Sequence, residues 1–333
     1  MQPPLGPAER ASEAFPRGPP PAIIIPMSPE TPSKGRAKAG AGLTRRRLLA
    51  AGAAIAGTGF GVGAYARWIE PTWVEVLERD LPVPNLPPAW DGLRVAHIAD
   101  LHHGSSVPLD YLARSISRVA DLRPDLVAVA GDFVTGSDAR YGSAVAELFA
   151  GLPAPLGIFA CLGNHDYGVR RPGRPGAVGV RQVAADLGRH GVRVLRNEAV
   201  RLERGGEGLW MVGVDDLWAG YCDPEKALRD VPRGAANLVL CHNPDAAEDL
   251  HAAGCGTILA GHTHGGQVQI PLLGPPILPV RNRQRYEGLH RVGGTWLNIN
   301  RGLGWLWRVR FACRPEISLL TLRPAERKGG DPA

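Results

Sequence analysis

The sequence predicts an α/β fold built around a mostly buried sheet. Short apolar runs of strand length alternate with amphipathic stretches of helical length from residue 93 onward. Strands that are apolar throughout are typical of sheets covered by helices. Polar residues gather directly after several of these apolar runs, and in open α/β sheets sites form at the carboxyl ends of the strands.

The composition of the 333 residues is that of an ordinary globular protein, with 44% hydrophobic and 21% charged residues. It excludes wholesale disorder, a collagen-like repeat and a disulfide-stapled miniprotein. The net charge of +6 comes mainly from residues 1–47, which hold eight basic and three acidic residues. The remainder is nearly neutral and has no aromatic–basic repeat, so we expect no nucleic-acid partner.

The N-terminus carries features of an export signal. Residues 1–43 are rich in proline and lack a periodic apolar pattern, which predicts a disordered leader, and Met27 is a candidate start. The segment 44–49, in which an arginine pair precedes two leucines, resembles the twin-arginine signal of bacteria. This resemblance implies the twin-arginine translocase as a partner, transport of an already folded chain, and a destination in the periplasm or cell envelope.

Residues 48–66 complete a predicted twin-arginine signal or signal anchor over 44–66. The stretch is uncharged and rich in alanine and glycine, which makes it weakly hydrophobic for a membrane span. Ala64-Tyr65-Ala66 has the small-residue pattern of a cleavage site. Cleavage after Ala66 and retention as a membrane anchor both fit these residues.

The remaining chain divides into a linker with an edge segment at 67–92, a domain at 93–323 and a disordered tail at 324–333. In the linker, an alternating run at 73–77 precedes a proline-rich connection. Helical spacing of apolar residues predicts helices at 108–122, 139–152, 178–190, 224–230 and 244–253. Apolar runs predict strands at 93–99, 126–130, 156–162, 192–195, 200–202, 209–214, 237–241, 257–260, 267–270, 286–289, 295–299 and 316–322.

The cysteines do not suggest a metal site or a disulfide framework. There are five, an odd number, and no C-x-x-C pair occurs. Cys161 and Cys241 end apolar runs and are expected to be buried.

Five polar motifs follow predicted strands: Asp100-Leu101-His102, Gly131-Asp132, Gly163-Asn164-His165-Asp166, His242, and Gly261-His262-Thr263-His264. Their order resembles the calcineurin-like metallophosphoesterases. The run from Gly261 to Gln267 resembles a bacterial branch of exported or membrane-associated phosphodiesterases, related to UDP-2,3-diacylglucosamine pyrophosphate hydrolases. The resemblance implies a four-layer αββα sandwich with a dimetal site at the carboxyl ends of the strands.

The residue types in these motifs suit a pair of divalent ions. Carboxylate, amide and imidazole ligands fit Mn, Fe or Zn, and the lack of a cysteine ligand argues against structural zinc. The motif glycines should allow tight turns. Asp100 and His102 are two residues apart, as are His262 and His264, and this spacing predicts extended backbone in which both side chains of a pair point the same way. The resemblance implies that one metal is held by Asp100, His102, Asp132 and His264, and the other by Asp132, Asn164, His242 and His262, with Asp132 bridging.

The resemblance also implies roles for residues beside the ligands. His165 would reach the substrate phosphate and protonate the leaving oxygen or stabilise the developing charge, and Asp166 would orient its ring. Many family members carry a charged residue where Thr135 stands, so a charged substrate contact is expected to be missing. His97 is expected in the core or behind a metal ligand, and His103 is a candidate hydrogen-bond donor to a ligand.

The implied function is a dinuclear phosphodiesterase or pyrophosphatase in which a hydroxide shared by the metals attacks phosphorus. A UDP-2,3-diacylglucosamine-like lipid of lipid A synthesis is the candidate substrate. The alternatives are an exported phosphomonoesterase and a non-catalytic metal- or cell-wall-binding protein. The apolar stretch 270–279 and the Trp305-Leu306-Trp307-Arg308 run predict an amphipathic substrate met at the membrane surface, unless these side chains simply cover a sheet edge.

Overall fold

The computed structural model describes residues 44–136, 138–172 and 179–325. Three parts of the expected organisation lie outside the described residues: the leader with Met27, the first residue of the helix expected at 178–190, and residues 326–333 of the tail. The chain divides into two compact units, Met1–Gly52 and Ala53–Ala333. The described residues of the first unit belong almost entirely to the start of helix α1 (Arg45–Ala64).

Helix α1 continues into a π-helical turn, Tyr65–Ile69, and a 3₁₀ turn, Glu70–Thr72. The stretch Arg45–Thr72 is long and apolar enough to cross a membrane, judged by length and composition. Its glycines do not interrupt the helix.

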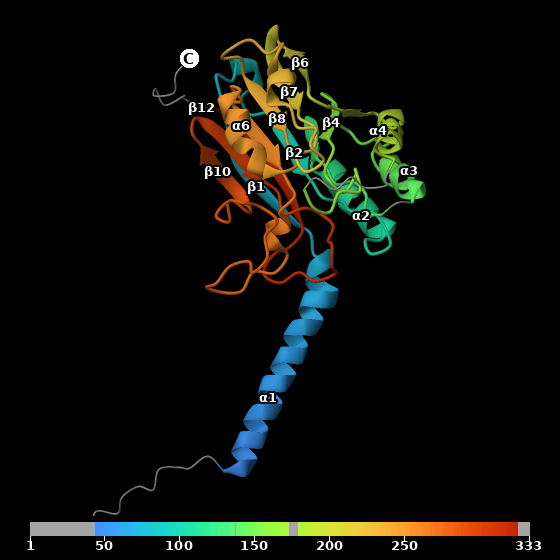
Figure 1. Ribbon diagram of the computed structural model, residues 1–333, viewed down its shortest axis with the longest axis vertical. Helices are drawn as coiled ribbons and strands as arrows, with labels where there is room; N and C mark the ends of the chain where they lie inside the picture. The colour runs from blue at the N-terminus through green and yellow to red at the C-terminus, as the bar shows by residue number, and fades with distance from the viewer. Residues whose placement is uncertain (1–43, 137, 173–178, 326–333) are drawn as a thin grey trace, which may run out of the picture. The chain divides into compact units, whose positions relative to one another are not determined.

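The second unit contains two six-stranded sheets (Figure 1). The first sheet has the order β1-β12-β2-β3-β4-β5. Strands β2 to β5 are parallel, and β12 pairs antiparallel with β2 and parallel with β1. The strands are β1 (Glu75–Pro84), β2 (Arg94–Ile98), β3 (Leu126–Ala130), β4 (Ile158–Cys161), β5 (Val192–Val194) and β12 (Glu316–Ala325).

The second sheet has the order β10-β11-β9-β8-β7-β6. Its four inner strands are parallel, and the two edge strands β10 and β6 are antiparallel to their neighbours. The strands are β6 (Glu198–Arg204), β7 (Glu207–Gly213), β8 (Asn237–Leu240), β9 (Thr257–Ala260), β10 (Gly288–Val292) and β11 (Thr295–Ile299).

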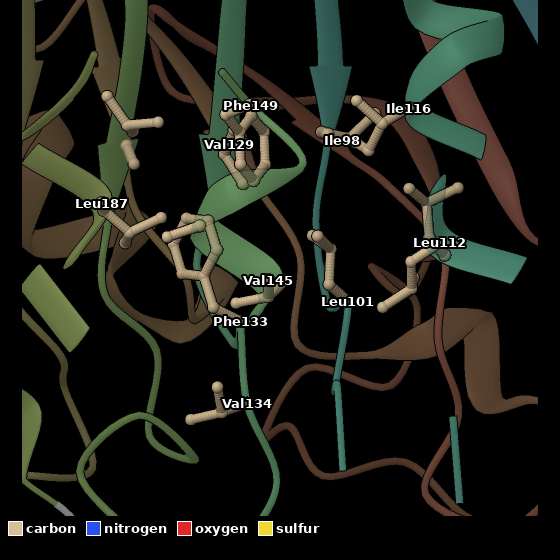
Figure 2. Close-up of a cluster of buried hydrophobic side chains, with 14 of the residues drawn as sticks. Ile98, Leu101, Leu112, Ile116, Val129, Phe133, Val134, Val145, Phe149 and Leu187 are labelled. Atoms are coloured by element: carbon tan, nitrogen blue, oxygen red, sulfur yellow. The ribbon is translucent and has the colours of Figure 1, made fainter. Parts of the chain in front are cut away.

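Three apolar clusters hold the layers together. Helices α2 (Leu109–Asp121), α3 (Ala139–Glu147) and α4 (Val180–Arg189) pack on the outer face of the first sheet, where Figure 2 shows their side chains against β2 and β3. A second cluster fills the space between the sheets. The third packs α5 (Pro224–Leu228) and α6 (Ala247–Ala252) on the second sheet. This is the expected αββα sandwich, and it explains why the inner strands are apolar on both faces.

Most expected elements are confirmed to within a few residues, and two expectations are wrong. The proline-rich run after Leu77 is not a connection, because Pro82 and Pro84 lie within β1. Strand β1 is an edge strand, where a missing N–H costs no ladder hydrogen bond. The strand expected at 267–270 is reduced to isolated bridges of Val268 with Phe311 and of Ile270 with Gly274.

Smaller differences concern the ends of elements. The strand expected at 286–289 begins only at Gly288, and the helix expected at 244–253 is split into a 3₁₀ turn, Pro244–Ala246, and α6. The expected burial of Cys161 and Cys241 is confirmed.

Candidate metal centre

The motif residues meet where both sheets present the carboxyl ends of their central strands. Loops after β2, β3 and β4 come from the first sheet, and loops after β8 and β9 come from the second. The side chains that these loops bring to one edge are all buried: Asp100, His102, Asp132, Asn164, His242, His262 and His264.

One group of donors consists of Asp100, His102 and His264, whose ligand atoms lie within 4.8 Å of one another. Nε2 of His264 is 3.4 Å from Oδ1 of Asp100 and 3.0 Å from Nε2 of His102. Two imidazole nitrogens and a carboxylate oxygen facing each other in this way suit a bound divalent cation.

A second group consists of Asp132, His242 and His262, again with ligand atoms within 4.8 Å of one another. Nε2 of His242 lies 3.1 Å from Oδ2 of Asp132 and 3.1 Å from Nδ1 of His262. The same Oδ2 of Asp132 is 3.5 Å from Nε2 of His102, a member of the first group. Asp132 therefore faces both groups with one carboxylate oxygen.

Two buried acceptor atoms without a hydrogen-bond partner in the described part of the chain indicate whether the site residues fit a cation. Oδ1 of Asp100 and Oδ1 of Asn164 are buried and lack a hydrogen-bond partner among the described residues. The amide nitrogen of Asn164 donates to the Val169 carbonyl at 2.5 Å, which fixes the side chain and leaves its oxygen available. A buried acceptor without a partner is costly, and a cation would satisfy both oxygens, so the residues fit the implied metals.

Three of these side chains are in the protonation states that suit metal binding, whereas His242 is not: burial would lower its pKa, but the neighbouring Asp132 carboxylate raises it to about 10. Burial lowers the pKa of His262 to about 3 and that of His264 well below its usual value. Burial alone would raise the pKa of Asp100, but the neighbouring His264 and His102 lower it to about 2. Neutral imidazole and ionised carboxylate are the forms that coordinate metals.

Hydrogen bonds behind the imidazoles fix which nitrogen faces the site. Nδ1 of His242 donates to the Ala130 carbonyl at 2.7 Å, and Nε2 of His262 donates to the Pro279 carbonyl at 3.2 Å. Such bonds set the tautomer and the ring orientation of a metal ligand.

Thr135 plays the same part for His102, which the sequence interpretation missed. Its Oγ1 lies 2.5 Å from Nδ1 of His102, so Nε2 of that ring is left for the site. The sequence drew attention to Thr135 only for the charge that it lacks. The overlooked signal was a hydroxyl three residues after Asp132, in a loop that runs beside the His102 loop, as the bond from the His102 N–H to the Asp132 carbonyl shows.

The ligand loops are strained, which corrects the expectation of extended backbone. Five candidate ligands have φ between 50° and 71°: Asp100, His102, Asp132, His262 and His264. Non-glycine residues rarely adopt this left-handed conformation, and it gathers at functional sites. The turns send the two i, i+2 partners His262 and His264 into different donor groups, whereas extended backbone would point them the same way.

Glycine is required at two motif positions because of close approach. A Cβ on Gly163 would lie 2.2 Å from Oδ1 of Asp132, and one on Gly261 would lie 2.5 Å from Oδ2 of Asp100. The expected tight turn applies to Gly131, whose φ is 81°.

His165 lies against both donor groups but is less buried than the ligands. Its backbone N–H donates to Oδ1 of Asp132 at 2.7 Å, and its ring meets that of His102 edge-on with 4.7 Å between centroids. Its ring nitrogen also falls within 4.8 Å of donor atoms of His102 and Asp132.

The expected pairing of Asp166 with the His165 ring is wrong. Asp166 is fully buried, and its carboxylate accepts four backbone N–H groups, from Gly163, Asp132, Phe133 and Val134, at 2.8 to 3.1 Å. The carboxylate thus holds the Asp132 loop in place. The adjacency of Asp166 to His165 in sequence does not bring their side chains together, because the turn directs the carboxylate back toward the backbone.

The two flanking histidines have structural contacts. His97 is fully buried, and its Nδ1 pairs with the Asn298 amide at 3.0 Å, which confirms the expected core position. His103 pairs with the Val107 carbonyl and packs against Tyr141, so its candidate role as a donor to a metal ligand is not supported.

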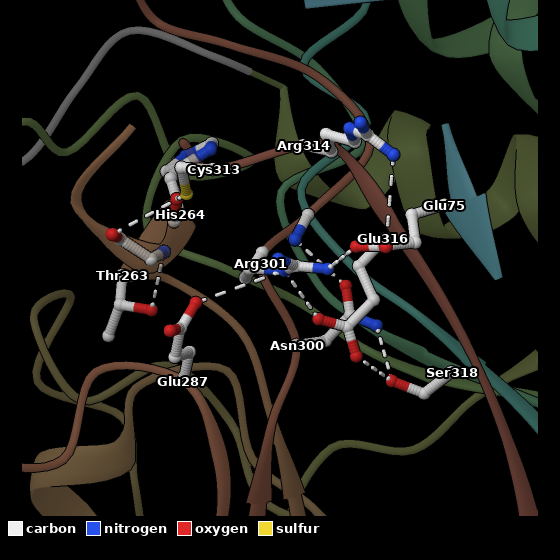
Figure 3. A network of polar contacts seen from close by, with 12 residues as sticks. Glu75, Thr263, His264, Glu287, Asn300, Arg301, Cys313, Arg314, Glu316 and Ser318 are labelled. Carbon is white, nitrogen blue, oxygen red and sulfur yellow. Dashed lines mark hydrogen bonds and ion pairs between the residues drawn. The ribbon is translucent and has the colours of Figure 1, made fainter. Parts of the chain in front are cut away.

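A polar network adjoins His264 (Figure 3). Sγ of Cys313 donates to the His264 carbonyl at 3.2 Å. Nearby, the Arg301 guanidinium bonds Glu316 at 2.8 Å and Glu75 at 2.7 Å, which ties this region to β12 and β1.

Comparison with known proteins gives consistent matches over this domain. Residues 93–266 match the calcineurin-like phosphoesterase family. The chain is 35% identical to phosphodiesterase YaeI of Escherichia coli over 283 residues, which cover 84% of this chain and 99% of the relative. It is 28% identical to UDP-2,3-diacylglucosamine pyrophosphatase LpxG of Chlamydia trachomatis over 300 residues, covering 77% and 91% of the two chains. A transmembrane protein with metallophosphoesterase domain from Danio rerio is 30% identical over 262 residues, covering 75% and 58%.

Proposed function

The chain belongs to the calcineurin-like phosphoesterase family, and from this premise we propose that it hydrolyses phosphodiester or pyrophosphate bonds with the aid of two divalent metal ions. The observation that carries the proposal is the position of Asp132. Its Oδ2 lies 3.1 Å from Nε2 of His242 and 3.5 Å from Nε2 of His102. One carboxylate that faces two donor groups is what a closely spaced pair of ions requires.

In this proposal each ion has four protein ligands. Asp100, His102, Asp132 and His264 would hold one, and Asp132, Asn164, His242 and His262 would hold the other. The unpartnered oxygens of Asp100 and Asn164 support this division. Two bound ions of Mn, Fe or Zn would neutralise phosphate charge and activate water for attack on phosphorus.

His165 is the residue that we propose acts on the substrate. Its ring is more accessible than those of the ligands and lies beside His102. From there it would hydrogen-bond a phosphate oxygen and donate a proton to the leaving oxygen. Asp166 would be a positioning residue, since its contacts are with the backbone that carries Asp132.

The substrate class is proposed from the relatives. The name of the Escherichia coli relative states a phosphodiesterase, and that of the Chlamydia relative states a UDP-2,3-diacylglucosamine pyrophosphatase. We therefore propose a phosphodiester or diphosphate whose leaving groups are large, such as a UDP-2,3-diacylglucosamine-like lipid. The helix at Arg45–Thr72 and the twin-arginine-like segment before it support delivery by the twin-arginine route to the cell envelope.

The deciding experiment is a metal-dependent substrate panel. The full chain is stripped with a chelator, reloaded with Mn, Fe or Zn, and assayed on bis(4-nitrophenyl) phosphate, 4-nitrophenyl phosphate and UDP-2,3-diacylglucosamine. We expect metal-dependent turnover with a preference for the diester or diphosphate. Preference for the monoester would identify a phosphomonoesterase. Tight metal binding without turnover of any substrate would identify a non-catalytic metal-binding protein.

A further inference from the structure

Large apolar side chains are exposed on two segments beside the metal centre. Leu272 is fully exposed, Leu273 is 81% exposed and Trp307 is 67% exposed. We define the apolar rim as these three residues with their exposed neighbours Ile270, Ile277 and Leu306. Outside this rim, the helical stretch Arg45–Thr72 and Trp73 directly after it, Tyr221 is the single large hydrophobic residue that is exposed in the described part of the chain. Such a concentration marks an interaction surface.

The conformation of Leu272 adds to this argument. Its φ is 69°, in the left-handed region that favours glycine or asparagine. A leucine there, at the tip of a turn closed by the Ile270–Gly274 bridge, is unfavourable both in its backbone and in its exposure to water. The chain thus has an apolar side chain where a small or polar residue would be more stable, and such local strain gathers at functional positions.

The two segments of the rim lie side by side and are fixed to the metal centre. Buried Gln267 bonds the carbonyls of Trp307 and Val309 and the N–H of Leu306. At the other end of the first segment, the Pro279 carbonyl accepts from Nε2 of His262 at 3.2 Å. The first segment of the rim therefore begins at Ile270, six residues after His264, and Pro279, two residues after its last member Ile277, is bonded to His262.

Trp305 does not belong to this surface, contrary to what the sequence suggested. It is fully buried, its Nε1 donates to the Ser106 carbonyl at 3.1 Å, and its ring packs near Tyr111. Of the two tryptophans, only Trp307 is exposed.

The candidate membrane helix ends on the same part of the molecule. The Ala66 carbonyl accepts from the N–H of Arg310 at 3.0 Å. The buried carboxylate of Glu70 accepts from the N–H groups of Ala312 and Cys313 at 3.1 and 2.5 Å. The chain that follows Trp307 is thus bonded to the last turns of the span. A segment bonded to the end of a membrane helix lies at the surface of the bilayer.

The side chains around this junction are of the interfacial type. Trp68, Ile69 and Trp73 are all about half exposed or more, and the guanidinium of Arg314 lies 3.7 Å from the centroid of the Trp73 ring. Arg281 and Arg283 are exposed and follow the first segment of the rim in sequence. Tryptophan and arginine together are favoured where hydrocarbon meets lipid headgroups, and arginine also attracts anionic lipids.

We propose that the apolar rim inserts into the bilayer that holds the helix, so that the metal centre opens onto the lipid–water interface. The substrate would keep its acyl chains in the membrane while its phosphate reaches the metals. The choice of substrate rests on the proposed function, whereas the docking of the rim does not. A lipid surface is the occupant because the rim is continuous with the end of the candidate span.

The test measures where the rim lies, without turnover or metal. In a Cys222→Ser background, Leu272→Cys is labelled with an environment-sensitive fluorophore, and the full chain is reconstituted into vesicles of phosphatidylethanolamine and phosphatidylglycerol. Arg204→Cys is the matched control, because it is exposed and lies at the β6–β7 turn, at the opposite end of the parallel strands from the metal centre.

We expect blue-shifted emission from position 272 and strong quenching by spin-labelled lipid, with neither effect at position 204. Equal, water-like emission from both positions would overturn the proposal. The proposal would also be overturned if the chain formed a dimer in detergent in which the label at position 272 is shielded from water, because a second copy of the chain would then cover the rim. Because no step of this measurement needs hydrolysis, its result is independent of the panel that tests the proposed function.

Discussion

Asp132 is the residue on which both donor groups depend. In Asp132→Asn, the neutral amide would weaken both metal sites, whereas its oxygen could still accept the N–H of His165 and keep the loop folded. We expect turnover to fall by more than about 100-fold, because replacing even a residue that only supports a metal ligand lowers metal affinity or activity by about 10–100-fold. Turnover and metal content of the purified variant check this. Near wild-type turnover with full metal occupancy would show that Asp132 does not bridge.

Replacement of His165 distinguishes two roles for its ring, that of a catalytic acid and that of a metal ligand. Its ring reaches donor atoms of His102 and Asp132, so the geometry alone allows either. We expect His165→Ala to lower turnover about 10²–10⁴-fold, as for the loss of a general acid, with metal content retained. Metal analysis of the same preparation is the control. The loss of one equivalent of metal would make His165 a ligand.

Thr135 tests the hydrogen bonds behind the metal ligands. Thr135→Val keeps the shape of the side chain but removes the oxygen that lies 2.5 Å from Nδ1 of His102. We expect metal affinity to fall about 10–100-fold, measured by competition with a chelator, and Thr135→Ser to restore it. If the valine and serine variants bind metal equally well, the contact does not orient His102.

At the level of residues, the sequence predicted which side chains gather at the candidate metal centre far better than the contacts that hold them there. Asp100, His102 and Asp132 stand in motifs with fixed spacing, and the structure brings them together. The bond of Thr135 to His102 and the four backbone bonds of Asp166 depend on how the loops turn. Those turns use left-handed backbone at non-glycine residues, which propensity and periodicity do not predict.

At the level of helices and strands, too, the sequence predicted the features that leave a local pattern and missed those that depend on distant contacts. The helices α2 to α4 were predictable because burial of one face leaves apolar residues at helical spacing, and the inner strands because burial of both faces leaves a short continuous apolar run. For strand β1, the alternating run at 73–77 indicated the start but not the second half, which contains Pro82 and Pro84 and pairs with residues of β12 that lie 241 positions away, as in Pro82 with Arg323. The stretch 267–270 looks like a strand by composition, yet within the described residues it forms isolated bridges only, of Val268 with Phe311 and of Ile270 with Gly274.

The helix that begins at Arg45 carries a prediction of its own. A signal peptidase must bind its substrate as an extended segment, but Ala66 is buried, lies in the helical turn Tyr65–Ile69, and bonds Arg310 through its carbonyl. If the domain folds before export, as the twin-arginine resemblance implies, this site is already closed. We therefore predict that the helix is retained as an anchor. The intact mass of the protein from the membrane fraction checks this, and a mature N-terminus at Arg67 would contradict it.

At the scale of the whole molecule, the end of the candidate membrane helix, the apolar rim and the candidate metal centre are connected through short contacts. Glu70 near the end of the candidate span accepts from the N–H of Cys313, and Sγ of Cys313 donates to the carbonyl of His264. None of these links has a sequence motif, because they join segments about 50 to 240 residues apart. The sequence suggested each part separately, and only the fold brings them to one face.

This arrangement makes a prediction about substrate presentation. Leu272→Ser, Leu273→Ser and Trp307→Ser are combined in the full chain, which is reconstituted into vesicles and assayed on a lipid-borne phosphodiester and on a soluble aryl phosphodiester. Complete burial of one leucine side chain is worth about 1.5–3 kcal/mol, so partial insertion of three side chains exceeds the 1.4 kcal/mol of a tenfold change. We expect the ratio of lipid-borne to soluble turnover to fall by at least about tenfold.

Two controls make the outcome specific to the membrane. Leu272→Met with Leu273→Met keeps apolar side chains of similar volume, so the ratio should stay near that of the unmodified chain. When the lipid substrate is dispersed in detergent, the serine variant should recover most of the difference, because the substrate then no longer has to be met at a bilayer. An equal fall on both substrates, or a deficit that persists in detergent, would instead mean that the rim supports the metal centre itself and that its exposure has another cause.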